Sequence, residues 1–309
     1  MISKRSNIAV IGAGKIAYSL VHALVKKNYK VKLIISNNFN SAKHLAKKFH
    51  IKDYTNNLAQ LDPQIKVLFI SVPDNQIKIT SNKLARLKIN FCNSLFIHLS
   101  GAENISVLNS LHRKGALTAS FHIMQAFPSK RIVKVENCYA AIETENKFAE
   151  RFLFNIAENL KLRPFKLGTE EKSLYHLAGV FASNFIVGNI FNSKNIFDIR
   201  KSQNNYNNLD FLLPILKSTI SNIKKLGNSK SLSGPIERGD LSTIKKHIKS
   251  LKKKSSATQM NYVYLNYIIQ SLNLTDVVKS KYGRLSENHL EIKRFLLKEF
   301  RKALNRKIF

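Results

Sequence analysis

Residues Asn7–Ala17 read NIAVIGAGKIA, and this stretch decides the fold. A short apolar run ends at Gly12, and an amphipathic helix pattern follows the glycines. Gly12 allows a tight turn, Gly14 lets the backbone approach a pyrophosphate, and Ala17 lets the helix pack close to the strand. Open amide groups at the start of a helix attract phosphates. The stretch therefore predicts a dinucleotide-binding turn, with cofactor contacts from Gly12, Gly14, Lys15, Ile16 and Ala17.

The loop after the second predicted strand bears on which dinucleotide binds. That strand is Val31–Ile35, and Ser36, Asn37 and Asn38 follow it. An NAD site usually carries an acidic residue here, roughly 20 residues past the glycines, to hold the ribose hydroxyls. The small polar residues offer hydrogen-bond donors and no carboxylate that would repel a 2′-phosphate. We therefore expect NADP(H) as the cofactor, with Ser36 and Asn37 among its contacts.

Length and composition limit the class of protein. The chain has 309 residues, of which 44% are hydrophobic, so two domains with sizeable cores fit. The two cysteines, Cys92 and Cys138, are too few for a disulfide framework and favour a reducing cytoplasm. No apolar run approaches the ~18 residues of a membrane span, and the N-terminus is not a signal peptide. We expect a cytoplasmic protein without a membrane partner.

The net charge of +32 raises the question of nucleic-acid binding. The excess is mostly lysine and is spread along the chain, and the dense cluster at residues 245–254 lies in a helical pattern. Aromatic residues are not interleaved with that cluster, as a base-stacking platform would require. We therefore expect no nucleic-acid partner. The same positive field would attract a small anionic substrate and NADP(H).

The order of predicted elements indicates two domains. Strand and helix patterns alternate from Ser6 to about Lys166, which predicts a doubly wound α/β domain with a parallel sheet. The predicted strands are Ile8–Ile11, Val31–Ile35, Val67–Ser71, Leu95–His98, Thr118–Phe121, Tyr139–Ile142 and Arg163–Lys166. After Gly168 the patterns are helical, with helices expected over Glu170–Asn192, Asn208–Leu226, Asp240–Lys252, Asn261–Leu272 and Glu287–Lys302, and a polar loop over Asn192–Asn207. The predicted domains are residues 1–167 and 168–309.

Polar residues follow several of the predicted strands. Ligands of open α/β sheets bind at the carboxyl ends of the strands, so these residues are candidate ligand contacts. Ser71, Val72 and Pro73 follow the third strand and are predicted to contact the cofactor. Ser100 follows the fourth strand and is expected to contact cofactor and substrate, and His122 at the fifth is a candidate proton donor. Histidines 98, 122, 176 and 247 show no spacing typical of metal ligands, so we expect no metal site.

The first helix of the second domain carries the strongest catalytic candidates. Lys172 and His176 are four residues apart and share a helix face. Ser183, about three turns after Lys172, returns to that face, and Asn184 lies beside it. A lysine ammonium in this position can stabilise the oxygen charge that hydride delivery creates and can supply its proton. Arg238, between two glycine turns, is a candidate ligand for a substrate carboxylate or else a partner of a neighbouring acid.

Together these motifs resemble a known family. They are Ile11–Ala17, Ser71–Asp74, His98–Ala102, Ser120–His122, Lys172–His176, Ala182–Asn184 and Gly234–Asp240. The family is an uncharacterised one that joins a Rossmann-like domain to a helical domain akin to the C-terminal domain of 6-phosphogluconate dehydrogenase. Some members resemble an alternative type of ketopantoate reductase, which implies NADPH and pantothenate synthesis. The wider superfamily carries a catalytic lysine that Lys172 matches, and His176 stands where an asparagine is common.

These observations predict an NADP-dependent oxidoreductase that reduces a small 2-oxo acid, with ketopantoate as the first guess. One alternative is an imine reductase of the pyrroline-5-carboxylate reductase type. Another is a regulatory protein that senses NADP without turnover. The helical domain carries more apolar stripes than one small bundle can bury, notably Phe185–Phe191 and Phe211–Leu216. We therefore expect a homodimer through that domain.

Overall fold

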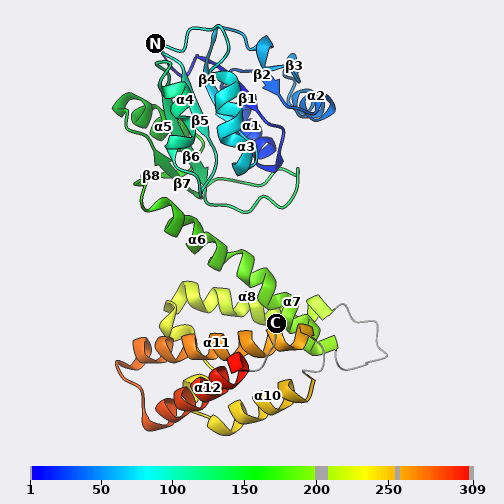
Figure 1. Cartoon of the computed structure of the whole chain (residues 1–309), viewed down its shortest axis with the longest axis vertical. Helices are drawn as coiled ribbons and strands as arrows, with labels where there is room; N and C mark the ends of the chain where they lie inside the picture. Colours follow the sequence, from blue (N-terminus) through cyan, green and yellow to red (C-terminus); the bar gives the residue numbers. More distant parts are fainter. Residues whose placement is uncertain (1, 199–207, 255–257, 306–309) are drawn as a thin grey trace. The chain divides into compact units, whose positions relative to one another are not determined.

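The computed structural model describes residues 2–198, 208–254 and 258–305 of the chain. Its internal contacts divide it into two compact units, Met1–Ile186 and Val187–Phe309 (Figure 1). The predicted domain boundary at residues 167/168 lies at the end of the last strand, whereas the first unit continues through the next helix. That helix, α6 (Lys172–Ala182), begins with a residue that is buried on the sheet.

The first unit is built on an eight-stranded sheet with the order β3-β2-β1-β4-β5-β6-β7-β8. The strands are β1 (Asn7–Ile11), β2 (Val31–Ile35), β3 (Asp53–Thr55), β4 (Ile65–Ile70), β5 (Leu95–His98), β6 (Leu117–Ile123), β7 (Tyr139–Glu143) and β8 (Arg163–Lys166). All neighbours pair in parallel except β6 and β7. The predicted strands and the doubly wound fold are confirmed, and the short β3 is an addition. The sheet reverses after β6 because residues 124–138, all described, contain no crossover helix.

Helices cover both faces of this sheet, as the alternation of strand and helix predicts (Figure 1). One face packs against α1 (Lys15–Lys26), α2 (Phe39–Lys48) and α5 (Lys147–Asn159). The other packs against α3 (Asp74–Leu84), the short 3₁₀ segment Ile105–Leu108 and α4 (Asn109–His112). A further 3₁₀ turn, Leu58–Gln60, precedes β4. Alternate residues of β1 and β4 belong to the two cores, so the strands are apolar on both faces, as buried parallel strands require.

A polar row crosses the second face at one end of the sheet. Ile11 pairs with Ile70, Ile70 with His98, His98 with Ser120, and Ser120 with Glu143. The apolar row of β1 and β4 thus becomes His98, Ser120 and Glu143 in β5, β6 and β7, and all three are buried. Such a row is costly unless its members find partners. Two of them, Ser120 and Glu143, contact Lys172, the first residue of α6.

The second unit is helical throughout its described part. Its elements are the rest of α7 (Asn184–Asp198), α8 (Asn208–Leu226), the 3₁₀ turn Ser229–Ser231, α9 (Pro235–Arg238), α10 (Leu241–Lys254), α11 (Thr258–Tyr282) and α12 (Glu287–Asn305). Residues of α9 to α12 form one core that includes Ile244, Ile268 and Leu296. The expected polar loop Asn192–Asn207 is wrong up to Asp198, where α7 continues, and residues 199–207 lie outside the described part.

One helical stretch, Lys172–Ile196, is long and apolar enough to cross a membrane by length and composition. The expectation that no run reaches that length is therefore wrong, because α6 and α7 together carry few charges. A single helix of this kind is weak evidence for a membrane span. The first residue of this stretch, Lys172, is buried in the sheet unit. The stretch is therefore tied at its start to a folded domain.

The buried His98 predicts an acid-sensitive fold. Burial penalises the imidazolium and, with the nearby charge of Lys172, lowers the His98 pKa from 6.5 to about 3. Below pH 6.5 His98 binds a proton in the unfolded chain but stays neutral in the folded chain. The free energy of unfolding therefore falls from pH 6.5 towards pH 3, by about 1.4 kcal/mol per pH unit. His98→Leu should remove this contribution and reduce the fall in stability between pH 7.5 and pH 4.5 in urea unfolding, while His122 keeps its own contribution.

The exposed His112 supplies the control, because His112→Gln should leave the profile as it is in the wild type. An unchanged pH dependence in His98→Leu would contradict the assignment.

Candidate functional site

The glycine turn has the geometry that the sequence predicts. Gly12 has φ +103°, and a Cβ on it would lie 2.2 Å from the carbonyl oxygen of Ser71, so only glycine fits. A Cβ on Gly14 would meet nothing closer than 3.6 Å, so Gly14 leaves space that the fold itself does not need. Gly14 is also the N-cap of α1, and within the described residues no side chain caps the helix. The first amides of α1 thus have no capping side chain, which suits a pyrophosphate, although Lys15, Ile16 and Ala17 do not themselves line the pocket beside the turn.

A pocket of about 390 Å³ lies beside this turn. Its walls include the predicted cofactor contacts Gly12, Gly14, Ser36, Asn37, Ser71, Val72 and Pro73. The side-chain oxygen of Asn38 accepts a hydrogen bond from the Ser41 amide at 2.9 Å and caps α2, and Asn38 lines the pocket together with Ser36 and Asn37. Among the described residues that line it there is no carboxylate, and Lys83 and Lys130 add two positive charges. The lining suits the phosphate groups of a dinucleotide.

The hydroxyl of Ser71 gives an independent sign of a ligand. Ser71 follows β4, is 5% exposed and lines the same pocket. Its Oγ is buried and has no hydrogen-bond partner among the described residues. Buried hydroxyls are nearly always satisfied, so this oxygen suits a polar group of a bound cofactor.

A second pocket, of about 430 Å³, brings together residues that the sequence placed far apart. His122 at the end of β6 and His176, Ser183 and Asn184 of the α6–α7 stretch all line it. Met124, Gly179 and Val180 add apolar walls. The α6 helix ends at Ala182 and α7 begins at Asn184, so the single helix predicted over Glu170–Asn192 is broken at Ser183.

His122 has a well-defined environment in this pocket. Its Nδ1 lies 2.9 Å from the hydroxyl of Tyr175, and its ring centroid is 6.3 Å from that of His176. A Cβ on Gly101 would lie 2.7 Å from His122 Nε2, so the ring packs directly on this glycine. Burial, then the charges of His176 and Lys172, lower the His122 pKa to about 4. The imidazole is therefore neutral at physiological pH.

Lys172 begins α6 and is buried against the sheet. The side chain is 2% exposed, and its Nζ lies 2.8 Å from Glu143 Oε2 and hydrogen-bonds to Ser120 Oγ. Burial lowers the Lys172 pKa, while the hydrogen bond and charge of Glu143 raise it. Lys172 does not line the second pocket, although its charge reaches both His98 and His122.

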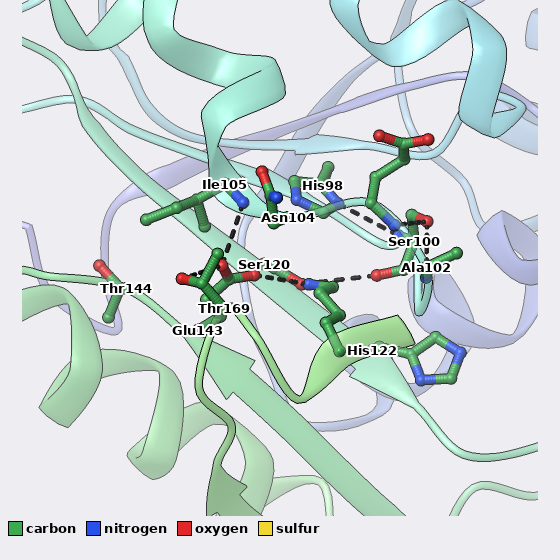
Figure 2. Close-up of polar contacts among 12 residues, drawn as sticks. His98, Ser100, Ala102, Asn104, Ile105, Ser120, His122, Glu143, Thr144 and Thr169 are labelled. Carbon is green, nitrogen blue, oxygen red and sulfur yellow. Dashed lines mark hydrogen bonds and ion pairs between the residues drawn. The ribbon is translucent and has the colours of Figure 1, made fainter. Parts of the chain in front are cut away.

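Glu143 completes this buried network (Figure 2). Its Oε1 accepts hydrogen bonds from the Ile105 amide at 3.2 Å and from Thr169 Oγ1 at 3.0 Å, while Oε2 pairs with Lys172. A carboxylate with every oxygen paired is stable in such a place. The network joins β6 and β7, the loop before α6 and the segment after β5.

Two further predicted residues have other surroundings. The Ser100 hydroxyl accepts the amides of Ala102 and Glu103 at 3.1 and 3.0 Å and so shapes the turn after β5 (Figure 2). Its ligand contacts stay predictions. Arg238 ends α9, between Gly234 and Gly239 with φ +108° and +71°, and is exposed. Glu237 pairs with Lys281 and Asp240 caps Thr243, so the alternative partners of Arg238 are engaged elsewhere.

Sequence reasoning missed several residues of these sites. Tyr175 lies within the Lys172–His176 motif but was given no functional role. Glu143 lies one residue beyond the predicted strand Tyr139–Ile142. A glutamate that ends an apolar strand was a usable signal, but its partner lies 29 residues away. Lys83 and Lys130 gave no local signal. In the described part of the chain no group of three or more His, Cys, Asp or Glu side chains is arranged to hold a metal ion.

Comparison with solved structures shows the fold. A protein of Bacteroides fragilis described as a "putative NADP oxidoreductase" is 23% identical over 91% of this chain and 99% of its own, with a TM-score of 0.71. A Thermotoga maritima protein is 24% identical over 89% of this chain and 99% of its own, with a TM-score of 0.68. A reductive aminase of Aspergillus terreus, in complex with NADPH and ethyl-5-oxohexanoate, is 12% identical over 96% and 94% of the chains, with a TM-score of 0.58.

Two family models match the sequence, and none of the curated proteins does. Residues 1–123 match a Rossmann-like domain. Residues 138–267 match the domain of unknown function DUF2520. The chain therefore joins a Rossmann-like amino-terminal domain to a helical DUF2520 region.

Proposed function

We propose that the chain is an NADP-dependent oxidoreductase that reduces a small carbonyl compound, in the first place a 2-oxo acid. The observation that carries this proposal is the glycine-turn pocket without a carboxylate, together with a second pocket that holds His122 and His176. The similarity in fold to a reductive aminase solved with NADPH supports it. The orphaned Ser71 hydroxyl and the uncapped start of α1 support a bound dinucleotide.

The chemistry asks for polar groups around a carbonyl oxygen. Bound NADPH supplies a hydride to the carbonyl carbon, and negative charge then develops on the oxygen. A neutral His122 can donate a hydrogen bond to that oxygen, and His176 lines the same pocket. In this proposal the positive charge of Lys172, which hydrogen-bonds to Ser120 and acts on His122, also stabilises the developing negative charge. Ser183 and Asn184 line the pocket and bind other polar groups of the substrate in this proposal.

A 2-oxo acid also needs a group that binds its carboxylate. Arg238 has the planar pair of donors that holds a carboxylate, and it is the candidate that the sequence predicts for this role. The positive field of the chain, with net charge +32, favours an anionic substrate. Ketopantoate is the first 2-oxo acid to test, on the resemblance of the motifs to the alternative ketopantoate reductases.

An imine reductase is the second candidate, and the position of Lys172 favours it. Reduction of an oxo acid calls for a lysine that can donate its proton to the substrate, whereas Lys172 is buried and paired with Glu143. Reduction of a protonated imine needs no such acid. A regulatory protein that binds NADP without turnover is the non-enzymatic alternative.

The test is oxidation of NADPH and NADH against a panel of 2-oxo acids, including ketopantoate, and cyclic imines. We expect turnover with NADPH and a 2-oxo acid, and tighter NADPH than NADH binding by titration. Ser36→Asp should reverse the cofactor preference, because its carboxylate would repel a 2′-phosphate and bind ribose hydroxyls.

Turnover of cyclic imines alone would support the second candidate. Tight NADPH binding without turnover of any compound would favour the sensor, and failure to bind either dinucleotide would overturn the proposal. Asn146→Asp, at the residue that caps α5 and does not line the pocket, is the control for an added charge away from the cofactor side.

The role of Lys172 can be separated from its role in folding. Lys172→Met should destabilise the fold by about 3–5 kcal/mol, because it leaves Glu143 buried and unpaired. The double variant Lys172→Met/Glu143→Gln should recover most of that stability. If Lys172 supports the developing oxygen charge, the double variant should still lose roughly 10²–10⁴-fold in kcat.

Near-normal kcat in the folded double variant would make Lys172 an anchor of α6 without a catalytic role. Lys166→Met is the matched control. It breaks a surface pair of the same length, 2.8 Å to Glu150, and should cost less than about 1 kcal/mol. Urea unfolding and steady-state kinetics provide the two readouts.

We also propose that the chain forms a homodimer through its second unit. Large apolar side chains of α7 and α8 are exposed, among them Val187 at 67% and Ile215 at 66%. Apolar surface on this scale marks an interaction site. Light scattering at micromolar concentration should give twice the chain mass, and Val187→Asp/Ile215→Asp should give the single mass. Leu304→Asp, 62% exposed on α12, is the control. A monomeric wild type would contradict the proposal.

A further inference from the structure

The contact between Tyr175 and His122 has no role in the function described so far. The hydroxyl of Tyr175 lies 2.9 Å from His122 Nδ1, and the two rings are perpendicular, at 88° with centroids 5.5 Å apart. Tyr175 is on α6, one turn after Lys172, whose pairing with Glu143 fixes the start of that helix. Phe165 of β8 packs against the other side of the tyrosine, with ring centroids 5.8 Å apart. The hydroxyl is therefore held in one place.

Either group could be the donor of this hydrogen bond, because a neutral phenol and a neutral imidazole each carry one proton. Burial raises the Tyr175 pKa to about 12, so the phenol keeps its proton. Among the described residues, this hydroxyl hydrogen-bonds to His122 Nδ1. A neutral imidazole carries one donor nitrogen and one acceptor nitrogen. If the phenol donates to Nδ1, the imidazole proton must be on Nε2.

The position of Nε2 gives this tautomer a consequence. Nε2 lies against Gly101, where a Cβ would be only 2.7 Å away, and His122 lines the second pocket. Among the described residues Nε2 has no hydrogen-bond partner, so its proton is available to a ligand. A carbonyl oxygen has lone pairs that accept such a proton, whereas the nitrogen of a protonated imine has none.

We propose that Tyr175 is a positioning residue, which fixes His122 as an Nε2–H donor and thereby selects a carbonyl oxygen over a protonated imine. The selection of substrate rests on the proposed function, but the tautomer does not, since it belongs to the protein without cofactor or substrate. The two parts can therefore fail separately.

The first test is the side-chain ¹H–¹⁵N correlation spectrum of the full-length, unliganded protein at pH 7. Histidine tautomers differ in the ¹⁵N shifts of the protonated and unprotonated nitrogens. The His122 signal, identified by its loss in His122→Gln, should show the proton on Nε2 and a hydrogen-bonded Nδ1. A proton on Nδ1 in the wild type would overturn the proposal.

The second test uses variants. Tyr175→Phe should move the Nδ1 shift towards that of an unbonded nitrogen. It should also lower kcat for the carbonyl substrate by about tenfold, the scale of one hydrogen bond, with a smaller change in KM. Tyr139→Phe removes the hydroxyl of a nearby, exposed tyrosine that also packs against Phe165, so its His122 Nδ1 shift should match the wild type.

An unchanged Nδ1 shift in Tyr175→Phe would overturn the positioning role even if activity fell. If the shift moves as expected but no carbonyl compound is ever turned over, the tautomer stands and the proposed function fails. If Tyr175→Phe does not fold, the wild-type spectrum still decides the tautomer.

Discussion

The buried ion pair between Lys172 and Glu143 is the interaction on which the rest of the first unit depends. Two charges taken out of water are costly, and their attraction offsets that cost only when geometry is good and the remaining polar atoms are bonded. Here the lysine meets Glu143 at 2.8 Å and Ser120, and the carboxylate also accepts from Ile105 and Thr169. Any slip of α6 along the sheet would leave a bare charge. The pair therefore sets the register of the helix more strictly than apolar packing would.

That register carries the second pocket. With Lys172 placed over Ser120, the next turn of α6 brings Tyr175 and His176 to His122, and the turn after that brings Gly179 to Met124. Residues two apart on β6 and its extension thus meet residues three or four apart on α6, as the repeats of strand and helix require. Gly101 and Gly179 each leave space where a side chain would collide with this column. The pocket is a consequence of one strand and one helix held in fixed register.

Local signals predicted the glycine turn and part of the pocket beside it, because these residues are adjacent in sequence. The run from Gly12 to Ala17 contains the turn, the uncapped helix start and the close packing in a few residues, and Ser36 and Asn37 follow directly from a strand end. The polar row of His98, Ser120 and Glu143 was hidden, because it arises only when three strands pair in register. The reversal at β7 was hidden too, since residues 124–138 have no pattern that distinguishes a return from a crossover. The burial of Lys172 could not be inferred without Glu143 and its row.

The electrostatics of the two pockets differ in a way that suits their proposed ligands. The cofactor pocket has lysines without a lining carboxylate, so it favours phosphate groups. In the second pocket His122 is neutral near pH 7, because its pKa is about 4. The charge of the nearby Lys172 is offset by its ion pair with Glu143. Protonation of His122 would place a second positive charge near Lys172, which is why the two act against each other. The neutral His122, with the paired Lys172 nearby, can stabilise the charge that develops on a substrate oxygen. The same arrangement does not bind an anion tightly before the reaction. Binding energy of that kind appears mainly in the transition state, where it raises kcat.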